Sequence, residues 1–412
     1  PDTASQIDHY MGLISFLRDN SILNVNTNCL ELGSNTGLFL KTLKPFVRTV
    51  LGIDPAENIA SLANSDGIET IPKFFNLESA RAIEQAYGQQ DLIIARHMFA
   101  HNRNPKMLLE AMNTLLTNEG SIMIENAYVV PTLQSGEFDQ IYHEHMFYYS
   151  VTSMQNLLAT NSFELFDLMD SRIHGGSITF LCARKGKKEI SPIIEEFMQE
   201  ERGLFEDEKI FLDFNQKILN IKSKVLEEIH QDIKEKKQIA AYGASAKAFT
   251  MFSFLDLDSS KISYCIDTTP TKIGKYFPGF SIKVISEKDR KLTAYHEAGH
   301  GLVSHFVPAG RPVAKISIVS RGHAGGFTRW EQEDQSYYSR DELEAQITAA
   351  MGGRSAEVMK CGDITTGASN DFEQATAIAR EMIMRYGMSE RLTHRSFGRR
   401  QETIFLGREM SE

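Results

Sequence analysis

Short apolar runs alternate with segments of helical spacing through the first part of the chain. The runs that predict strands are residues 28–32, 49–53, 91–95 and 120–125. Alternation of strands with helices is typical of a doubly wound α/β sheet, in which crossover helices join parallel strands. We therefore expect a doubly wound, Rossmann-like domain over residues 1–185, with the fold class α/β.

A helical pattern and a second, shorter α/β pattern come next. Residues 239–242 and 262–266 predict two more strands, with a glycine turn after the first. Residues 186–284 are therefore expected to hold a helical connector and part of a second Rossmann-like unit. In the connector, apolar residues recur at helical spacing and predict one buried stripe. This stripe consists of Phe211, Phe214, Ile218, Ile221, Val225 and Ile229.

The pattern changes once more near residue 285. Beyond this point it is mainly helical, beginning with residues 291–306, and we expect a separate, mainly helical domain over residues 285–412. Polar residues placed before apolar stripes predict two helix caps in this part of the chain. The predicted caps are Ser339 with Glu342, and Asn370 with Glu373.

Composition narrows the choice of partner and compartment. The 412 residues carry a net charge of −10 at pH 7, which argues against nucleic acid because phosphates attract basic surfaces. The four cysteines show no paired spacing for disulfides or thiolate metal sites, and this favours a reducing, cytoplasmic compartment. No apolar run reaches the roughly 20 residues that span a bilayer. We therefore expect no membrane segment in this chain, and small molecules or peptides as ligands.

The first predicted strand ends in a glycine turn of the form Glu-x-Gly-x-x-x-Gly. Glu31, Gly33 and Gly37 form this pattern, with Asn35 between the glycines. Glycines let the backbone approach a ligand at the carboxyl end of a strand, and the next strand ends in Asp54, a carboxylate suited to ribose hydroxyls. The turn lacks the spacing of dinucleotide-binding and phosphate-binding loops, which favours S-adenosylmethionine as cofactor. The alternative is a turn that only packs a helix on a strand.

A dense group of titratable residues lies farther along the same predicted domain. Tyr142, Glu144 and His145 stand within a few residues of one another. A histidine titrates near neutral pH, and a neighbouring hydroxyl or carboxylate can orient it, so this segment is suited to supply a general base. The alternative is a surface cluster with no catalytic role.

Four segments of the chain occur in the order seen in one enzyme family. With these segments, the chain up to about residue 284 resembles S-adenosylmethionine-dependent sugar C-methyltransferases. The resemblance implies methyl transfer to a carbon next to the keto group of a nucleotide-linked deoxysugar. It also implies His145 as the base, with Tyr142, Glu144 and His101 binding or polarising the sugar. The four segments are residues 30–37, 142–145, 174–177 and 242–247.

A metal-binding pattern lies in the helix predicted at residues 291–306. His296 and His300 stand four positions apart and therefore share one helical face. Two imidazoles on one face can hold a zinc ion, and Glu297 beside them can take a proton from water bound there. The alternative is an unrelated helix, because so short a pattern also arises by chance.

Further motifs surround this pattern and occur in the order of a second family. With them, the chain from about residue 285 resembles the proteolytic domain of FtsH-type ATP-dependent zinc metalloproteases. The resemblance implies a zinc metalloendopeptidase with peptides as substrates and Asp371 as the third zinc ligand. The motifs are residues 294–300, 320–322, 324–328, 352–357 and 365–371.

The two resemblances imply unrelated chemistries, sugar methylation and proteolysis. Both families ordinarily carry parts that we do not find here, including a cysteine-rich zinc module in the first family and a membrane segment with an ATPase module in the second. We therefore expect a composite of two truncated proteins. The alternative is a chimera that binds S-adenosylmethionine or zinc without a complete activity. The sequence leaves the oligomeric state open, a homo-oligomer included.

Overall fold

A computed structural model describes residues 4–171, 175–318, 326–331, 337–362 and 364–392. The chain separates into two compact units, which are described one at a time. Unit 1 comprises Pro1–Glu228 and Ala246–Leu255, and unit 2 comprises Ile229–Ser245 and Asp256–Glu412. Helix α10 (Ala246–Leu255) therefore belongs to unit 1, although the strand before it belongs to unit 2.

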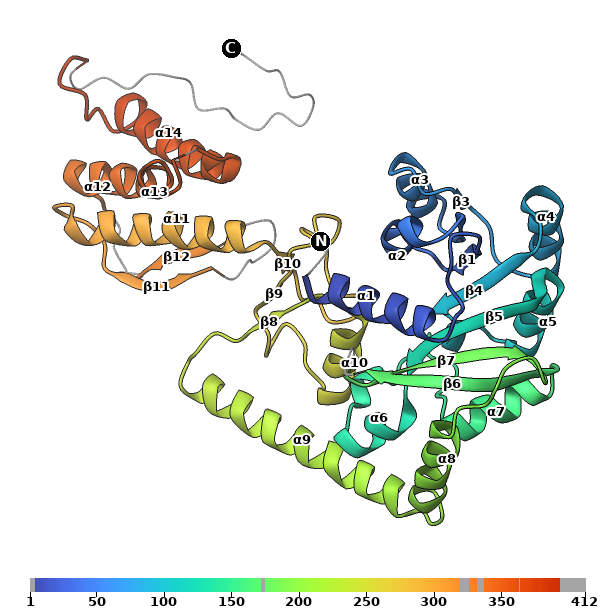
Figure 1. Cartoon of the computed structure of the whole chain (residues 1–412). Coiled ribbons are helices and arrows are strands. Elements are labelled where there is room, and N and C mark those ends of the chain that lie inside the picture. Colours follow the sequence, from blue (N-terminus) through green and yellow to red (C-terminus); the bar gives the residue numbers. More distant parts are fainter. Residues whose placement is uncertain (1–3, 172–174, 319–325, 332–336, 363, 393–412) are drawn as a thin grey trace, which may run out of the picture. The chain divides into compact units, whose positions relative to one another are not determined.

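A seven-stranded sheet forms the centre of unit 1 (Figure 1). Its order is β3-β2-β1-β4-β5-β7-β6; β1 to β5 are parallel, and β7 runs antiparallel to β5 and β6. The order reverses beside β1, so the carboxyl ends of β1 and β4 meet where open α/β sheets bind ligands. This confirms the predicted doubly wound fold. The strands are β1 Asn28–Leu32, β2 Thr49–Ile53, β3 Thr70–Ile71, β4 Gln90–Arg96, β5 Leu116–Ala127, β6 Phe163–Ser171 and β7 Ser177–Arg184.

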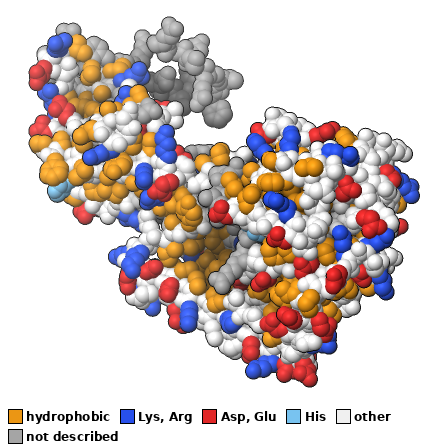
Figure 2. Space-filling view, viewed as in Figure 1, with side chains coloured by type: hydrophobic (Ala, Val, Ile, Leu, Met, Phe, Trp, Pro, Cys, Tyr) orange, Lys and Arg blue, Asp and Glu red, His pale blue; other side chains and the backbone are white. Residues whose placement is uncertain are grey.

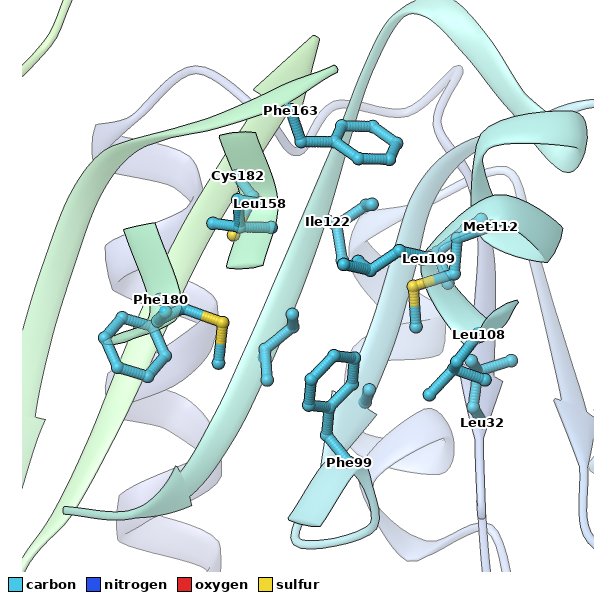
Figure 3. Packing of buried hydrophobic residues seen from close by; sticks show 14 of the residues in the cluster. Leu32, Phe99, Leu108, Leu109, Met112, Ile122, Leu158, Phe163, Phe180 and Cys182 are labelled. Carbon is cyan, nitrogen blue, oxygen red and sulfur yellow. The ribbon is translucent and has the colours of Figure 1, made fainter. Parts of the chain in front are cut away.

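Helices cover both faces of this sheet, because its strands present apolar side chains on both. Helices α4, α5 and α7 cover one face, where Phe99, Phe163 and Phe180 are fully buried (Figure 3). Helices α1 and α2 cover the other face. Burial of each large apolar side chain contributes roughly 1.5–3 kcal/mol, so the sheet is a firm support for the loops at its edge. The helices are α1 Ala4–Asp19, α2 Leu38–Leu43, α3 Glu57–Ser65, α4 Leu77–Tyr87, α5 Pro105–Leu115, α6 Val129–Ser135, α7 Val151–Ala159 and α8 Ile193–Leu204, with 3-10 turns η1 Lys44–Phe46, η2 Phe99–His101 and η3 Phe138–Gln140.

The predicted connector holds α8 and a longer helix, α9 (Lys209–Lys234), and the stripe predicted to be buried along α9 is only partly buried. Within this fully described helix, Ile229 is the only buried side chain, and Phe211 is 50% exposed. Helical spacing of apolar residues reveals a helix, whereas burial also requires a second element packed on that face. The sequence pattern therefore predicts the helix but does not say what packs on its apolar face.

Unit 2 begins with a small parallel sheet of order β10-β9-β8, which confirms the partial second Rossmann-like unit. A mainly helical part follows, as predicted. The hairpin of β11 and β12 packs along α11, and the indole nitrogen of Trp330 donates to Ser304 Oγ at 2.9 Å. The elements are β8 Ala240–Tyr242, β9 Tyr264–Ile266, β10 Val284–Ile285, α11 Glu287–Phe306, β11 Val313–Ser317, β12 Phe327–Trp330, α12 Arg340–Ala350, α13 Gly352–Cys361, η5 Thr366–Ala368 and α14 Ser369–Met384.

Two of the predicted helix boundaries in unit 2 differ from the structure, and one cap is confirmed. Helix α11 begins earlier than residue 291, because the Ser286 hydroxyl accepts a hydrogen bond from the backbone of Asp289 at 2.9 Å. The capping box of Ser339 and Glu342 is present as predicted. The cap predicted at Asn370 is wrong, because the chain enters α14 directly from η5 and the helix already includes Ser369.

The surface carries both signs of charge. In the face shown in Figure 2, acidic and basic side chains are interspersed and form no continuous basic area. Among the described residues, no helix has the length and apolar character needed to cross a membrane.

Candidate functional sites

The glycine turn between β1 and α2 has three residues in the left-handed region. Gly33, Asn35 and Gly37 have φ angles of 64°, 52° and 75°. A Cβ atom on Gly37 would also lie 2.8 Å from the Ile68 side chain, so this position requires glycine for two reasons. Asp54 holds the turn, because its Oδ2 accepts a hydrogen bond from the backbone N–H of Asn35 at 3.0 Å. Asp54 Oδ1 accepts a hydrogen bond from the backbone N–H of Ala56 at 2.9 Å.

A cleft of about 670 Å³ opens beside this turn. Four of the residues predicted for the cofactor line it: Glu31, Gly33, Asn35 and Asp54. The fifth, Gly37, lies outside the lining and packs against Ile68. The size suits a drug-sized ligand, for which pockets of roughly 300–1,000 Å³ are usual.

A largely buried cation, Arg96, lines the cleft and was not predicted as a site residue. The guanidinium carbon of Arg96 lies 4.4 Å from the ring centroid of Tyr10 and 4.3 Å from that of Phe39, so the cation is held between two aromatic faces. Arg96 Nε is 3.4 Å from Glu31 Oε1 and 3.8 Å from Glu125 Oε2. Burial raises the pKa of Glu31 to about 7, although Arg96 acts in the opposite direction.

Three of the residues predicted to bind or deprotonate the acceptor form a chain of contacts from Tyr142 through His145 to His101, and His101 lines the cleft. His145 Nδ1 donates to the backbone oxygen of Gln140 at 2.9 Å, so His145 Nε2 is free to accept from the Tyr142 hydroxyl, also at 2.9 Å. His101 lines the cleft, and its ring centroid lies 5.0 Å from that of His145. Burial lowers the pKa of both histidines, which keeps them neutral at pH 7. Glu144 is exposed and lies 3.9 Å from His143 Nε2.

In unit 2, three side chains converge on one point, as the sequence predicted. His296 and His300 come from α11, and Asp371 comes from the first turn of α14. The two Nε2 atoms are 3.0 Å apart, and they lie 3.1 Å and 3.5 Å from Asp371 Oδ2. Ligand atoms on a tetrahedral zinc ion are about 3.3 Å apart, since each bond is about 2.0–2.1 Å long. The spacing therefore fits a zinc ion.

The hydrogen bonds behind the two imidazoles fix which nitrogen faces the centre. His296 Nδ1 lies 2.7 Å from Glu357 Oε1, and His300 Nδ1 lies 2.8 Å from the backbone oxygen of Ala349. Both partners are acceptors, so each Nδ1 carries a hydrogen and each Nε2 faces the centre. Three acceptor atoms this close are stable only with a cation among them, either a proton or a metal ion.

The close approach of these three side chains also shifts their pKa values. Burial raises the pKa of Asp371, but hydrogen bonds from His296 and His300 outweigh it and bring that pKa to about 2. Burial lowers the pKa of the two histidines, and the hydrogen bonds to Asp371 and Glu357 outweigh this effect, so both are raised. A carboxylate with two imidazoles is a donor set typical of catalytic zinc sites.

Close helix packing brings these ligands together. A Cβ atom on Gly299 would lie 2.3 Å from the backbone oxygen of Gly352, so α11 and α13 meet at their glycines. A Cβ atom on Gly353 would lie 2.6 Å from both His296 Nε2 and His300 Nε2. The imidazoles therefore pack directly on the backbone of α13.

Glu297, the predicted proton acceptor, is buried next to the ligands on α11. The Thr328 hydroxyl donates to Glu297 Oε2 at 2.7 Å and fixes the carboxylate. Thr328, like Glu357, was missed as a site residue. Both lie in motifs of the second resemblance, but only the fold shows that they contact residues 31 and 61 positions away.

Comparison with known proteins finds two families in the chain. A model described as methyltransferase domain matches residues 6–168, and a model described as C-methyltransferase C-terminal domain matches residues 172–295. The model of peptidase family M41 matches residues 283–412.

The similar proteins fall into the same two families. C-methyltransferase NovU from Streptomyces niveus is 31% identical over 287 residues, which cover 69% of this chain and 68% of that protein. ATP-dependent zinc metalloprotease FtsH 1 from Thermoanaerobacter sp. (strain X514) is 49% identical over 129 residues, which cover 31% of this chain and 21% of that protein. The chain thus spans about two thirds of the first relative and about a fifth of the second.

Solved structures similar to the chain include the YcgJ protein from Bacillus subtilis, at a TM-score of 0.33 and 12% identity, covering 43% of this chain and all of that one. Another is magnesium protoporphyrin IX methyltransferase from Synechocystis PCC 6803 with bound SAH, at a TM-score of 0.35 and 12% identity, covering 45% of this chain and 89% of that one. Two findings identify the family of the chain. One is the extent of its match to NovU, and the other is its match to the two methyltransferase models. The chain belongs to the C-methyltransferases, and its residues 283–412 match the model of peptidase family M41.

Proposed function

We propose that unit 1 uses S-adenosylmethionine to methylate a carbon next to the keto group of a nucleotide-linked deoxysugar. One observation carries the proposal: His101 lines the methyl-donor cleft and is in ring contact with His145, so a general base stands next to the donor. Glu31, Gly33, Asn35 and Asp54 surround the donor. Gly37 shapes the turn from outside the cleft.

In this proposal, His145 takes the proton from the acceptor carbon through Nε2. The hydrogen bond from Nδ1 to Gln140 holds the ring in the required tautomer. Tyr142 turns its hydroxyl from His145 Nε2 to the keto oxygen, where it donates to the negative charge that develops. His101 and Glu144 bind the sugar hydroxyls. S-adenosylmethionine supplies the electrophilic methyl group that the carbanion takes.

The test is transfer of a labelled methyl group to a set of nucleotide-linked keto-deoxysugars. We expect label on a carbon of the sugar, and a decrease in turnover of about 10²–10⁴-fold in His145→Gln. Binding of S-adenosylmethionine, followed by calorimetry, should persist in that variant. His143→Gln is a matched control, because its side chain is 88% exposed. Wild-type turnover in His145→Gln would contradict the assignment.

We further propose that residues 283–412 bind zinc and cleave peptides. The supporting observation is the convergence of His296 Nε2, His300 Nε2 and Asp371 Oδ2 within 3.0 to 3.5 Å of one another. A zinc ion bound there supplies a Lewis acid and an activated water. Glu297, fixed by Thr328, accepts a proton at Oε1 and later passes it to the leaving amine.

Metal analysis and peptide cleavage test this second proposal. We expect one zinc ion per chain, loss of cleavage on chelation, and loss of zinc in Asp371→Asn. Glu297→Gln should keep zinc and lose about 10²–10⁴-fold in cleavage rate. Glu287→Gln, at the exposed start of the same helix, is the matched control. Unchanged cleavage in Glu297→Gln would remove the role of this residue.

We also propose that the chain is composite and that its location is cytoplasmic. The models of the two families overlap at residues 283–295, the relative in the first family matches 287 residues, and the FtsH relative matches 129. We propose that two unrelated reading frames, or two engineered pieces, are joined there. Full-length sequencing of transcripts from the source tests this idea, and an uninterrupted natural transcript would contradict it. The alternative function is a chimera that binds its cofactors and has neither complete activity.

A further inference from the structure

A second pocket lies in unit 2, between the neighbouring helices α12 and α14 (Figure 1). Its volume is about 590 Å³, within the roughly 300–1,000 Å³ that is usual for ligand pockets. None of the three zinc-binding side chains lines it. Part of its lining is an apolar wall, formed by Leu343, Ile378 and Met388, and three tyrosine side chains complete the apolar and aromatic part. The function proposed for residues 283–412 gives this pocket no role.

An arginine, Arg311, lines the same pocket. Its guanidinium carbon lies 5.0 Å from the ring centroid of Tyr338, so the cation stacks on an aromatic face. The backbone oxygen of Arg311 accepts a hydrogen bond from Ser304 Oγ at 2.7 Å, which ties this segment to α11. Among the described residues, the Arg311 guanidinium has no carboxylate partner. Its N–H groups are therefore available to an anionic ligand.

A second donor comes from α12. Gln346 lines the pocket, and its Nε2 atom is buried without a hydrogen-bond partner among the described residues. A buried amide without a partner is unfavourable. Rotation about the last bond of the side chain turns this nitrogen toward the pocket, where a ligand oxygen would accept its hydrogen bond. The pocket thus offers a cation and an amide donor beside its apolar wall.

The pocket also contains one carboxylate, that of Glu381. Glu381 Oε2 accepts a hydrogen bond from the Tyr386 hydroxyl at 2.7 Å, and Oε1 lies 3.5 Å from Arg385 Nη1. These contacts offset part of its negative charge. Glu381 therefore opposes an anionic ligand less than a carboxylate without partners would, and its removal should favour such a ligand.

We propose that this pocket binds the C-terminus of a peptide, with the terminal carboxylate on Arg311 and Gln346 and an apolar last side chain on the apolar wall. A guanidinium presents paired N–H groups that match the two oxygens of a carboxylate. The apolar wall gives the last side chain a surface to cover, because apolar area leaves water there. Binding itself does not depend on the peptidase function proposed above, whereas the role of the pocket in holding substrates rests on that function.

The pocket shares α12 and α14 with the metal centre. Ile378 stands seven positions after Asp371, so the two residues share one face of α14 and lie about 10 Å apart along its axis. Glu381 lies about 15 Å from Asp371 by the same measure. An extended peptide covers about 3.3 Å per residue, so a C-terminus held in the pocket places the bond at the metal centre about three to five residues upstream.

Binding is measured by fluorescence anisotropy of a labelled hexapeptide that ends in leucine, as the free acid and as the amide. The protein is the full zinc-loaded chain with Glu297→Gln, so that the peptide is not cut. We expect the amide to bind about tenfold more weakly than the acid. Arg311→Met should weaken binding of the acid by about 10–100-fold and leave the amide unchanged, and Gln346→Leu should weaken it by about fivefold. Glu381→Gln should tighten binding of the acid, a gain that misfolding cannot produce.

Arg340→Met is the matched control, because Arg340 begins α12, is 45% exposed and lies outside the pocket. If this control weakens binding as much as Arg311→Met does, the overall charge explains the effect and the inference is wrong. Equal binding of acid and amide also overturns it. So does an unchanged affinity in Arg311→Met, since the carboxylate would then bind elsewhere, for example on the zinc ion.

Mass spectrometry of peptides cut by the chain with its native Glu297 separates this inference from the proposed function. We expect cuts about three to five residues before a free C-terminus, and loss of this preference in Arg311→Met. Peptides that bind through Arg311 and are never cut would overturn the peptidase function and leave the pocket in place. Cuts at positions unrelated to the C-terminus would overturn its role in holding substrates, while the peptidase function stands.

Discussion

The metal centre and the methyl-donor cleft differ in how far the protein alone completes them. At the metal centre, each imidazole has its second nitrogen bound, one to Glu357 and one to the Ala349 backbone, and the ligand atoms already stand at the spacing of a zinc site. In the cleft, Glu31 Oε2 and two nitrogens of Arg96 are buried without hydrogen-bond partners among the described residues. One site is preorganised, whereas the other contains unsatisfied polar atoms.

This difference predicts where mutations will act. A preorganised site loses ligand affinity when a supporting group is removed, because the support places the ligand atoms. A site with buried unsatisfied charge affects the folded state itself, because burial of a charge is unfavourable without a partner. The four predictions below test this contrast, in order of decreasing effect.

Gly37→Ala should have the largest effect and should act on unit 1. The left-handed backbone disfavours alanine by roughly 1–2 kcal/mol, and the contact with Ile68 adds about 1–3 kcal/mol of overpacking. We expect about 2–5 kcal/mol of lost stability in urea unfolding followed by hydrogen exchange of unit 1. Gly67→Ala is a control for the cost of the left-handed backbone alone, since φ is 80° there and a Cβ atom would meet open space. Equal losses in the two variants would exclude the steric contribution.

The stability of unit 1 should depend on pH through Glu31. The pKa of this buried carboxyl is about 7 in the folded chain, against an ordinary value of 4.5, so the folded state binds more protons than the unfolded state between these values. Stability therefore falls as pH rises from about 4.5 to 7, by up to about 3 kcal/mol. Glu31→Gln should flatten this part of the profile. A wild-type profile that rises over the same range would contradict the pKa direction.

Glu357→Gln should weaken zinc binding by about 10–100-fold, because the uncharged amide orients His296 less strongly. Competition with a chromogenic chelator measures the affinity. Unit 1 should keep its stability, since the change is confined to unit 2. Glu344→Gln on the exposed face of α12 is a control with the same change of charge. Full zinc affinity in Glu357→Gln would show that the centre is less dependent on its support than we infer.

Ser339→Ala should have the smallest effect. It removes the capping box at the start of α12 and should destabilise unit 2 by about 1 kcal/mol. Zinc affinity should stay within about twofold, because the change lies at the start of α12 and the Ala349 backbone that holds His300 lies at its far end. A large loss of zinc would mean that the two properties are coupled through this helix.

The sequence was most informative where one helix carries the site. Spacing alone placed His296, Glu297 and His300 on one face of α11, whereas Asp371 required a family resemblance because it lies on another helix. The support from Glu357 could not be predicted, since it depends on how α13 packs against α11. Periodicity describes one element and does not specify its neighbours.

The methyl-donor cleft shows the opposite case. The glycine turn was predictable because the left-handed residues and the acid at the end of β2 are local features. Arg96 was not, because its position between Tyr10 and Phe39 depends on three elements far apart in the chain. The error at Asn370 has the same origin, because η5 determines where α14 begins.

The hydrogen bond from Trp330 to Ser304 has a practical consequence. Trp330 is the only tryptophan of the chain, and Ser304 lies on the helix that carries His296 and His300. Its fluorescence therefore reports on the peptidase half alone, while the methyltransferase half is silent at the same excitation wavelength. Tryptophan emission therefore follows the melting of the peptidase half separately from that of the other half, without cutting the chain.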